Sequence, residues 1–71
     1  METIVKNQPI RIEFGDYDNF ATMIPLEILQ YEPERRPHVL IRWAYPNDDR
    51  TIDLWHPSDH DVDFDSFGFE R

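Results

Sequence analysis

Two stretches of alternating residues near the middle of the chain, joined by a short turn, most constrain its fold. Residues 38–45 (His-Val-Leu-Ile-Arg-Trp-Ala-Tyr) and residues 50–56 (Arg-Thr-Ile-Asp-Leu-Trp-His) flank residues 46–49 (Pro-Asn-Asp-Asp). This arrangement is typical of a β-hairpin, because turn residues separate two runs that favour extended structure. Both arms carry apolar residues on two faces, as central strands and the strands of small barrels do.

A second alternating segment precedes this hairpin. Residues 10–14 follow a proline and read Ile-Arg-Ile-Glu-Phe, so they predict a half-buried strand with Ile10, Ile12 and Phe14 facing inward. Residues 15–19 combine glycine with aspartate and asparagine, which is turn chemistry. The chain is therefore expected to start with a strand and a turn.

Residues 20–31 allow two interpretations because they contain a proline. A polar residue before the segment could cap a helix, but Pro25 would lie in the helix interior, where proline costs about 3 kcal/mol or more. The segment is either a pair of short strands bent at Pro25, or a strand over residues 21–24 followed by a helical turn that begins at Pro25. The strand interpretation is favoured, and residues 32–37 then form a charged, proline-containing loop.

Together these elements predict one mainly β domain over residues 1–71, because a chain of 71 residues builds one core. The expected architecture is a small antiparallel meander or a partly open barrel of about five strands with at most one short helical turn. The alternative is an α+β fold, a sheet plus one short helix. The strand pattern of residues 21–24, 38–43 and 51–55, with its two tryptophans, resembles SH3-like and Tudor-like barrels, and that resemblance implies a barrel architecture.

The charge of the chain is negative and unevenly distributed. The net charge is −8, and residues 47–71 hold eight acidic residues against only Arg50 and Arg71. Such a field repels nucleic acid and anionic lipid over about 8 Å at physiological salt and attracts cationic surfaces. We therefore expect no direct binding to nucleic acid or membrane, and a basic protein surface as the partner.

Residues 57–71 form an acidic C-terminal segment with aspartate at every second position. These aspartates are Asp59, Asp61, Asp63 and Asp65. In an extended strand they would all project from one face, with carboxylates about 6.6 Å apart, whereas one DNA strand carries a charge about every 3.4 Å. Imitation of nucleic acid would therefore need help from Asp48, Asp49 and Asp53. The simpler alternative is that the aspartates form the solvated face of an edge strand or a frayed tail.

The aromatic residues of the hairpin offer a second candidate site. Trp43, Tyr45 and Trp55 lie on its two arms, and packing of Trp43 on Trp55 would place two large rings near Asp53. Rings beside a carboxylate can hold a Lys or Arg side chain through cation–π contacts. The alternative is that these rings form the core. The phenylalanines of the C-terminal segment pose the same choice between docking on the domain and anchoring a partner.

No pattern predicts an enzyme, a metal site or a cofactor. The chain has no cysteine, and its serines and threonines lack a nucleophile motif. The acidic segment aligns with a calcium-binding loop, but Phe64 occupies the position that requires glycine. Pro57 separates His56 from His60, which argues against a helical pair of zinc ligands. The absence of cysteine, of a signal-peptide pattern and of a long apolar run favours a cytoplasmic protein.

The sequence thus predicts a non-enzymatic acidic protein-binding module. Its most concrete form is a small inhibitor, of the kind phages and mobile elements encode, that occupies a basic nucleic-acid-binding surface of a host complex. Two alternatives stay open: a barrel that reads a cationic peptide through the aromatic residues named above, and a structural or assembly subunit. The sequence leaves the oligomeric state open.

Overall fold

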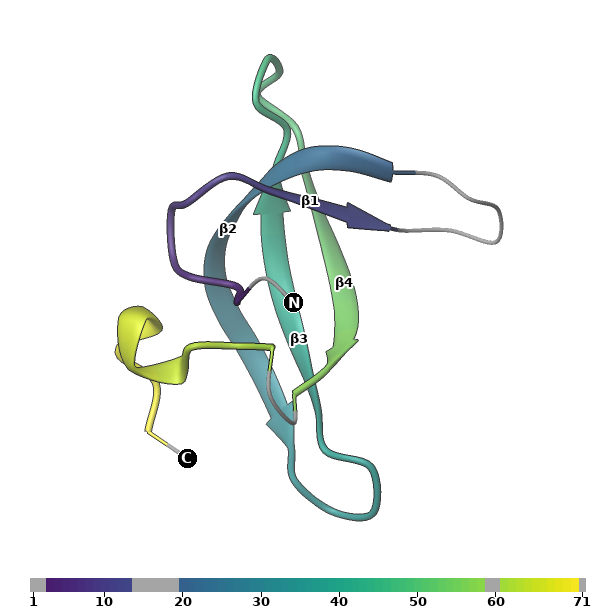
Figure 1. Ribbon diagram of the computed structural model, residues 1–71, viewed down its shortest axis with the longest axis vertical. Coiled ribbons are helices and arrows are strands. Elements are labelled where there is room, and N and C mark those ends of the chain that lie inside the picture. The colour runs from purple at the N-terminus through teal and green to yellow at the C-terminus, as the bar shows by residue number, and fades with distance from the viewer. Residues whose placement is uncertain (1–2, 14–19, 59–60, 71) are drawn as a thin grey trace.

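A four-stranded antiparallel sheet that curls into a half-barrel dominates the computed structural model, which describes residues 3–13, 20–58 and 61–70 (Figure 1). The strands follow one another in the order β1-β2-β3-β4. Their bounds are β1 (Ile10–Glu13), β2 (Phe20–Glu32), β3 (His38–Ala44) and β4 (Thr51–Pro57). The mainly β prediction is confirmed, and the described residues contain no helix except one 3-10 turn, η1 (Phe64–Phe67).

Strand β2 resolves the ambiguity around Pro25 in favour of extended structure. It is one continuous strand of 13 residues, and its register against β3 shifts between Pro25 and Glu27 and again between Ile28 and Gln30. Such bulges increase the local twist and accept a proline without loss of a ladder hydrogen bond. The first part of β2 therefore pairs with β1 and the rest with β3, which curls the sheet.

The predicted strand and hairpin are both present. β1 has Ile10 buried and Ile12 partly buried, while Phe14 lies outside the described residues. β3 and β4 pair directly over their whole length, from His38 opposite Pro57 to Ala44 opposite Thr51. Hence the turn chemistry between two alternating runs correctly located the centre of the fold.

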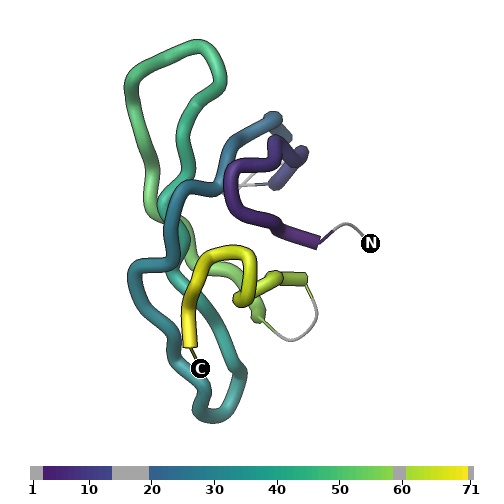
Figure 2. Tube along the Cα trace, turned by 90° about the vertical axis from the view of Figure 1, so that its left-hand side faces the viewer, coloured from purple at the N-terminus to yellow at the C-terminus, as the bar shows by residue number. Residues whose placement is uncertain are grey.

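The core lies on the concave face of the sheet and is closed by the two ends of the chain. Met23 from β2 and Val39, Ile41 and Trp43 from β3 are fully buried. Ile4 forms an isolated parallel bridge with Val62: its N–H donates to the Asp61 carbonyl at 2.6 Å, and its carbonyl accepts from the Asp63 N–H at 2.9 Å. Figure 2 shows both terminal segments on the same side of the curled sheet.

The C-terminal segment corrects the expectation of an alternating acidic strand. Phe64–Phe67 is a 3-10 helix, capped by Asp63, whose Oδ1 accepts from the Ser66 N–H at 3.3 Å. Gly68, with φ 66°, ends the helix in the left-handed conformation that glycine adopts without strain. An aspartate three residues before a serine thus satisfies local N–H groups, and this competes with extended structure.

The phenylalanines of this segment dock on the domain. The Phe64 ring is buried and meets Tyr31 edge-on at a centroid distance of 5.1 Å, and Phe69 meets the same tyrosine at 6.2 Å. Phe67 is partly buried against the same core.

Among the described residues there is no helix long and apolar enough to cross a membrane.

Candidate functional site

The acidic residues that the sequence singled out lie in separate places. Asp48 and Asp49 lie in the exposed turn between β3 and β4, at the top of Figure 1, whereas the C-terminal segment lies at the lower left. The molecule is 33 Å long. Asp48 Oδ1 accepts from the Arg50 N–H at 3.1 Å, so its carboxylate is partly used in the turn. The aspartates of the hairpin turn and the acidic residues of the C-terminal segment therefore do not form one continuous surface.

The aspartates of the C-terminal segment do not form a ladder. Asp63 is partly buried and caps η1, Asp65 is exposed in the first turn of that helix, and the partly buried Asp61 lies beside a pocket described below. Asp59 lies outside the described residues. The expected strand face is therefore replaced by carboxylates with different roles, because the backbone turns at residues 64–67.

The expected packing of Trp43 on Trp55 is wrong. Directly opposite residues of antiparallel strands share a face, and Trp43 lies opposite Ile52 whereas Trp55 lies opposite Leu40. Trp43 is 0% exposed in the concave core, and Trp55 is 47% exposed on the convex face. The predicted aromatic pocket therefore does not assemble, and of its remaining members Tyr45 packs against the core.

Asp53 is engaged by a cation of its own sheet. It lies opposite Arg42, whose Nε donates to Asp53 Oδ1 at 3.0 Å and whose second nitrogen donates to Oδ2 at 3.4 Å. The hydrogen bond and charge of Asp53 raise the pKa of Arg42 above its ordinary value. Asp53 is thus part of an ion pair on the convex face rather than a free carboxylate for a partner.

His56 is a polar residue that the fold places next to the core. Its Nε2 accepts a hydrogen bond from Trp43 Nε1 at 2.8 Å. An indole N–H can only donate, so Nε2 carries no proton and the neutral imidazole carries its hydrogen on Nδ1. Burial lowers the pKa of His56 from its ordinary value. His56 is therefore neutral at physiological pH and accepts the Trp43 hydrogen bond through Nε2.

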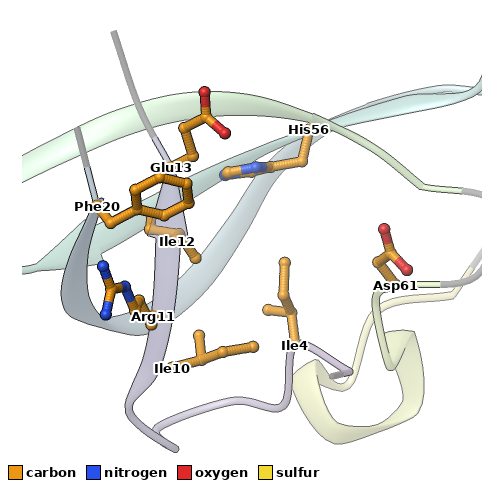
Figure 3. Close-up of a pocket in the computed structure, with 8 residues that line it drawn as sticks. All are labelled: Ile4, Ile10, Arg11, Ile12, Glu13, Phe20, His56 and Asp61. Atoms are coloured by element: carbon orange, nitrogen blue, oxygen red, sulfur yellow. The ribbon is translucent and has the colours of Figure 1, made fainter. Parts of the chain in front are cut away.

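A pocket of about 530 Å³ opens on the concave side, and we call it the inner pocket (Figure 3). Its apolar side chains come from β1, the start of β2 and the N-terminal segment, and charged groups and His56 surround them. The Arg11 guanidinium lies 5.0 Å from the centroid of the Phe20 ring, so this cation already has an aromatic partner. The lining residues are Ile4, Ile10, Arg11, Ile12, Glu13, Phe20, His56 and Asp61.

A second pocket, of about 560 Å³, lies at the end of β4 and is called the outer pocket. The exposed Trp55 ring forms one wall and lies 4.7 Å from the His38 ring, centroid to centroid. His38 Nδ1 lies 2.7 Å from the Arg36 carbonyl, to which it donates. The other lining residues are Arg36, Pro37, His56 and Pro57. His56 therefore connects the two pockets.

Sequence reasoning named two residues that line these pockets, Trp55 and Asp61, but it did not predict the pockets themselves. Phe20, Ile4 and His56 are far apart in the chain, and only the curl of the sheet and the bridge between the termini bring them together. No sequence pattern signalled these pockets, because a single exposed apolar residue such as Phe20 is common on protein surfaces.

The described part of the chain contains no group of three or more His, Asp or Glu side chains placed to hold a metal ion. The arrangement consists of apolar pockets with charged rims, which suits binding of a partner's side chains.

Comparison with protein-family models, with curated proteins and with solved structures finds no match.

Proposed function

We propose that the protein is a non-enzymatic, acidic protein-binding module that attracts a basic surface of its partner. The observation that carries this proposal is an excess of carboxylates without cationic partners. Between residues 51 and 70 the sequence contains no Lys or Arg, and Arg42–Asp53 is the sole ion pair within 4.0 Å among the described residues. Uncompensated carboxylates raise the association rate with a cationic partner and make it dependent on salt.

The docking of the C-terminal segment supports this proposal. Phe64 and Phe69 fix the segment on Tyr31, so its exposed carboxylates, Asp65 and Glu70, are held on a folded body. A preorganised charge loses less conformational entropy on binding than a charge on a free tail. The same docking uses the phenylalanines internally, which leaves the acidic groups and the two pockets to contact a partner.

The more specific version of this proposal is that the protein is an inhibitor of the kind that phages and mobile elements encode. Such an inhibitor would cover a basic nucleic-acid-binding surface of a host complex. Small size and a net charge of −8 favour this form. The separation of the hairpin-turn acids from the C-terminal acids favours a surface with two distinct basic areas over a continuous phosphate-binding path. The alternative function, recognition of a cationic peptide by an aromatic pocket, lacks geometric support because Trp43 and Trp55 lie on opposite faces of the sheet.

The test is capture of partners from a lysate with the tagged protein, with stepwise salt elution, on charge-reversal variants. We expect the double variants Asp48→Lys with Asp49→Lys, and Asp65→Lys with Glu70→Lys, to elute at lower salt than the wild type. Glu34→Lys, in the loop between β2 and β3, is the control for a change of charge elsewhere. Unchanged retention of both double variants would contradict the proposal, and competition by added nucleic acid would favour its more specific version.

A further inference from the structure

Strand β4 is an open edge of the sheet. It is the last strand in the order β1-β2-β3-β4, and the half-barrel does not close by pairing β4 with β1. Its seven residues alternate between exposed and partly buried, and Asp53, held by Arg42, is its one charged side chain at neutral pH. An edge strand presents unpaired backbone groups that can pair with another extended chain.

The register identifies which backbone groups of β4 face outward. The Tyr45 N–H donates to the Arg50 carbonyl at 3.3 Å, and the Ser58 N–H donates to the Pro37 carbonyl at 3.1 Å. In an antiparallel pair, hydrogen-bonded and non-bonded pairs alternate along the strand. Even-numbered residues of β4 therefore bond to β3, and the N–H groups of Thr51, Asp53 and Trp55 point away from the sheet.

The two pockets meet at His56, near the end of this edge. The inner pocket opens on the concave side beside His56, and the outer pocket includes Trp55 and Pro57, which lie on the convex face. Side chains of any strand added to β4 would alternate between these two faces. Strand-addition sites obtain affinity from the backbone and selectivity from pockets that receive alternate side chains.

We infer that the protein binds its partner by strand addition: an extended segment of the partner pairs with the outer edge of β4 and inserts apolar side chains into the inner and outer pockets. This inference rests on the proposed function, since it names how the acidic module holds its partner. The partner segment forms backbone hydrogen bonds with Thr51, Asp53 and Trp55. Glu13 and Asp61 line the inner pocket together with Arg11, so its lining carries one net negative charge and favours Lys or Arg residues next to the apolar ones.

Charge favours such a partner over a second copy of this chain. Each copy carries a net charge of −8, so the approach of two copies is opposed by electrostatic repulsion. A segment that carries apolar and basic residues on both faces would meet complementary charge instead. The occupant we assign to β4 is therefore an apolar and basic strand of another protein.

The first experiment follows amide hydrogen exchange by NMR on the wild-type protein. The probe is a capped valine-lysine peptide of seven residues, to match β4, in which pairs of valines alternate with pairs of lysines so that both faces of the added strand carry valine. We expect the Thr51, Asp53 and Trp55 amides to exchange at least about tenfold more slowly at saturating peptide, because they gain hydrogen bonds. The Ile52 and Leu54 amides, which already face β3, are the internal control and should change little.

The control peptide has the same side chains but carries N-methyl groups on alternate residues, on the backbone edge that would face β4. It has the same charge and fewer hydrogen-bond donors, so it should bind at least about tenfold more weakly. Lack of protection on β4 at millimolar valine-lysine peptide would overturn the inference. Protection of the same amides by protein concentration alone would overturn it in favour of a second copy.

A matched pair of variants tests the same edge from the protein side. Asp53→Pro removes an outward N–H and spares the bonds to β3, as is usual for proline in edge strands, whereas Asp53→Asn removes the charge and keeps the N–H. We expect Asp53→Pro alone to weaken peptide binding by about tenfold or more. Equal affinities would overturn the inference, and if Asp53→Pro does not fold, the exchange experiment decides.

The two proposals can fail separately. If charge-reversal variants lose a salt-sensitive partner while β4 gains no protection, the strand-addition inference fails and the acidic module stands. If β4 is protected by the valine-lysine peptide while charge reversal leaves partner capture unchanged, the role proposed for the carboxylates fails.

Discussion

The β3–β4 hairpin and the C-terminal segment have similar sequence patterns but different structures. Both alternate residue types with a period of two, yet the first is a pair of seven-residue strands and the second contains a 3-10 helix. The hairpin arms have each other as hydrogen-bonding partners. The C-terminal segment has the isolated bridge to Ile4 and local bonds made by Asp63 and Ser66. Alternation therefore predicts a strand only where a second strand is available.

The largest expected effect comes from the core side of the hairpin. Trp43→Ala should lower the free energy of unfolding by about 3–5 kcal/mol, because a fully buried ring leaves a cavity. Trp55→Ala, on the convex face, should lower it by less than about 1 kcal/mol. Urea unfolding followed by circular dichroism measures both. Equal losses would contradict the assignment of the two tryptophans to opposite faces.

The next effect tests whether the C-terminal segment is part of the same folded unit. Phe64→Ala should lower the free energy of unfolding by about 3 kcal/mol and expose residues 61–70 to proteases, because Phe64 is 3% exposed and packs on Tyr31. Asp65→Ala, at an exposed position beside it, is the matched control. Proteolysis and urea unfolding report the two results. A protease-resistant segment in Phe64→Ala would show that other contacts hold it.

A pH titration tests the hairpin side of the comparison through His56, whose Nε2 accepts from Trp43 of the neighbouring strand. Folding lowers its pKa, so the unfolded state binds more protons at mildly acidic pH. The contribution of His56 to stability is complete above pH about 6.5 and is lost as the pH falls through the lowered pKa. His56→Gln keeps a hydrogen-bond acceptor for Trp43 and should flatten this dependence.

His38→Gln, on the outer side, is the control for the replacement of an imidazole elsewhere in the fold. Glu13 and Asp61 share the inner pocket with His56, so variants of these two residues separate their contribution from that of the imidazole. Urea unfolding between pH about 8 and about 5 measures the profiles. An unchanged profile in His56→Gln would contradict the assignment of the pH dependence to this residue.

The smallest effect concerns the local bonds that distinguish the C-terminal segment from a strand. Asp63→Ala removes the cap of η1 and should lower the free energy of unfolding by about 1 kcal/mol. Asp63→Asn keeps an oxygen that can accept from the Ser66 N–H and should retain most of the stability. Thermal unfolding resolves this difference, and equal losses in both variants would point to the charge of Asp63 instead of its cap.

Much of the fold was predictable because it depends on neighbours in the chain. The alternation of residues 10–13, the turn between β3 and β4 and the extended path through Pro25 are local properties. The candidate site was less predictable. Trp43 and Trp55 were expected on one face, and the register, which depends on the pairing of two strands, placed them on opposite faces.

Local sequence patterns were enough to predict a small, acidic, mainly β chain with a central hairpin, because period-two patterning and turn residues act over short distances. The positions of its acidic groups and pockets depend on the tertiary structure. Bulges in β2 curl the sheet, the bridge between Ile4 and Val62 joins the terminal segments, and two pockets form around His56 near the end of β4. These features arise from contacts between residues far apart in the chain, which a pattern of neighbours does not encode.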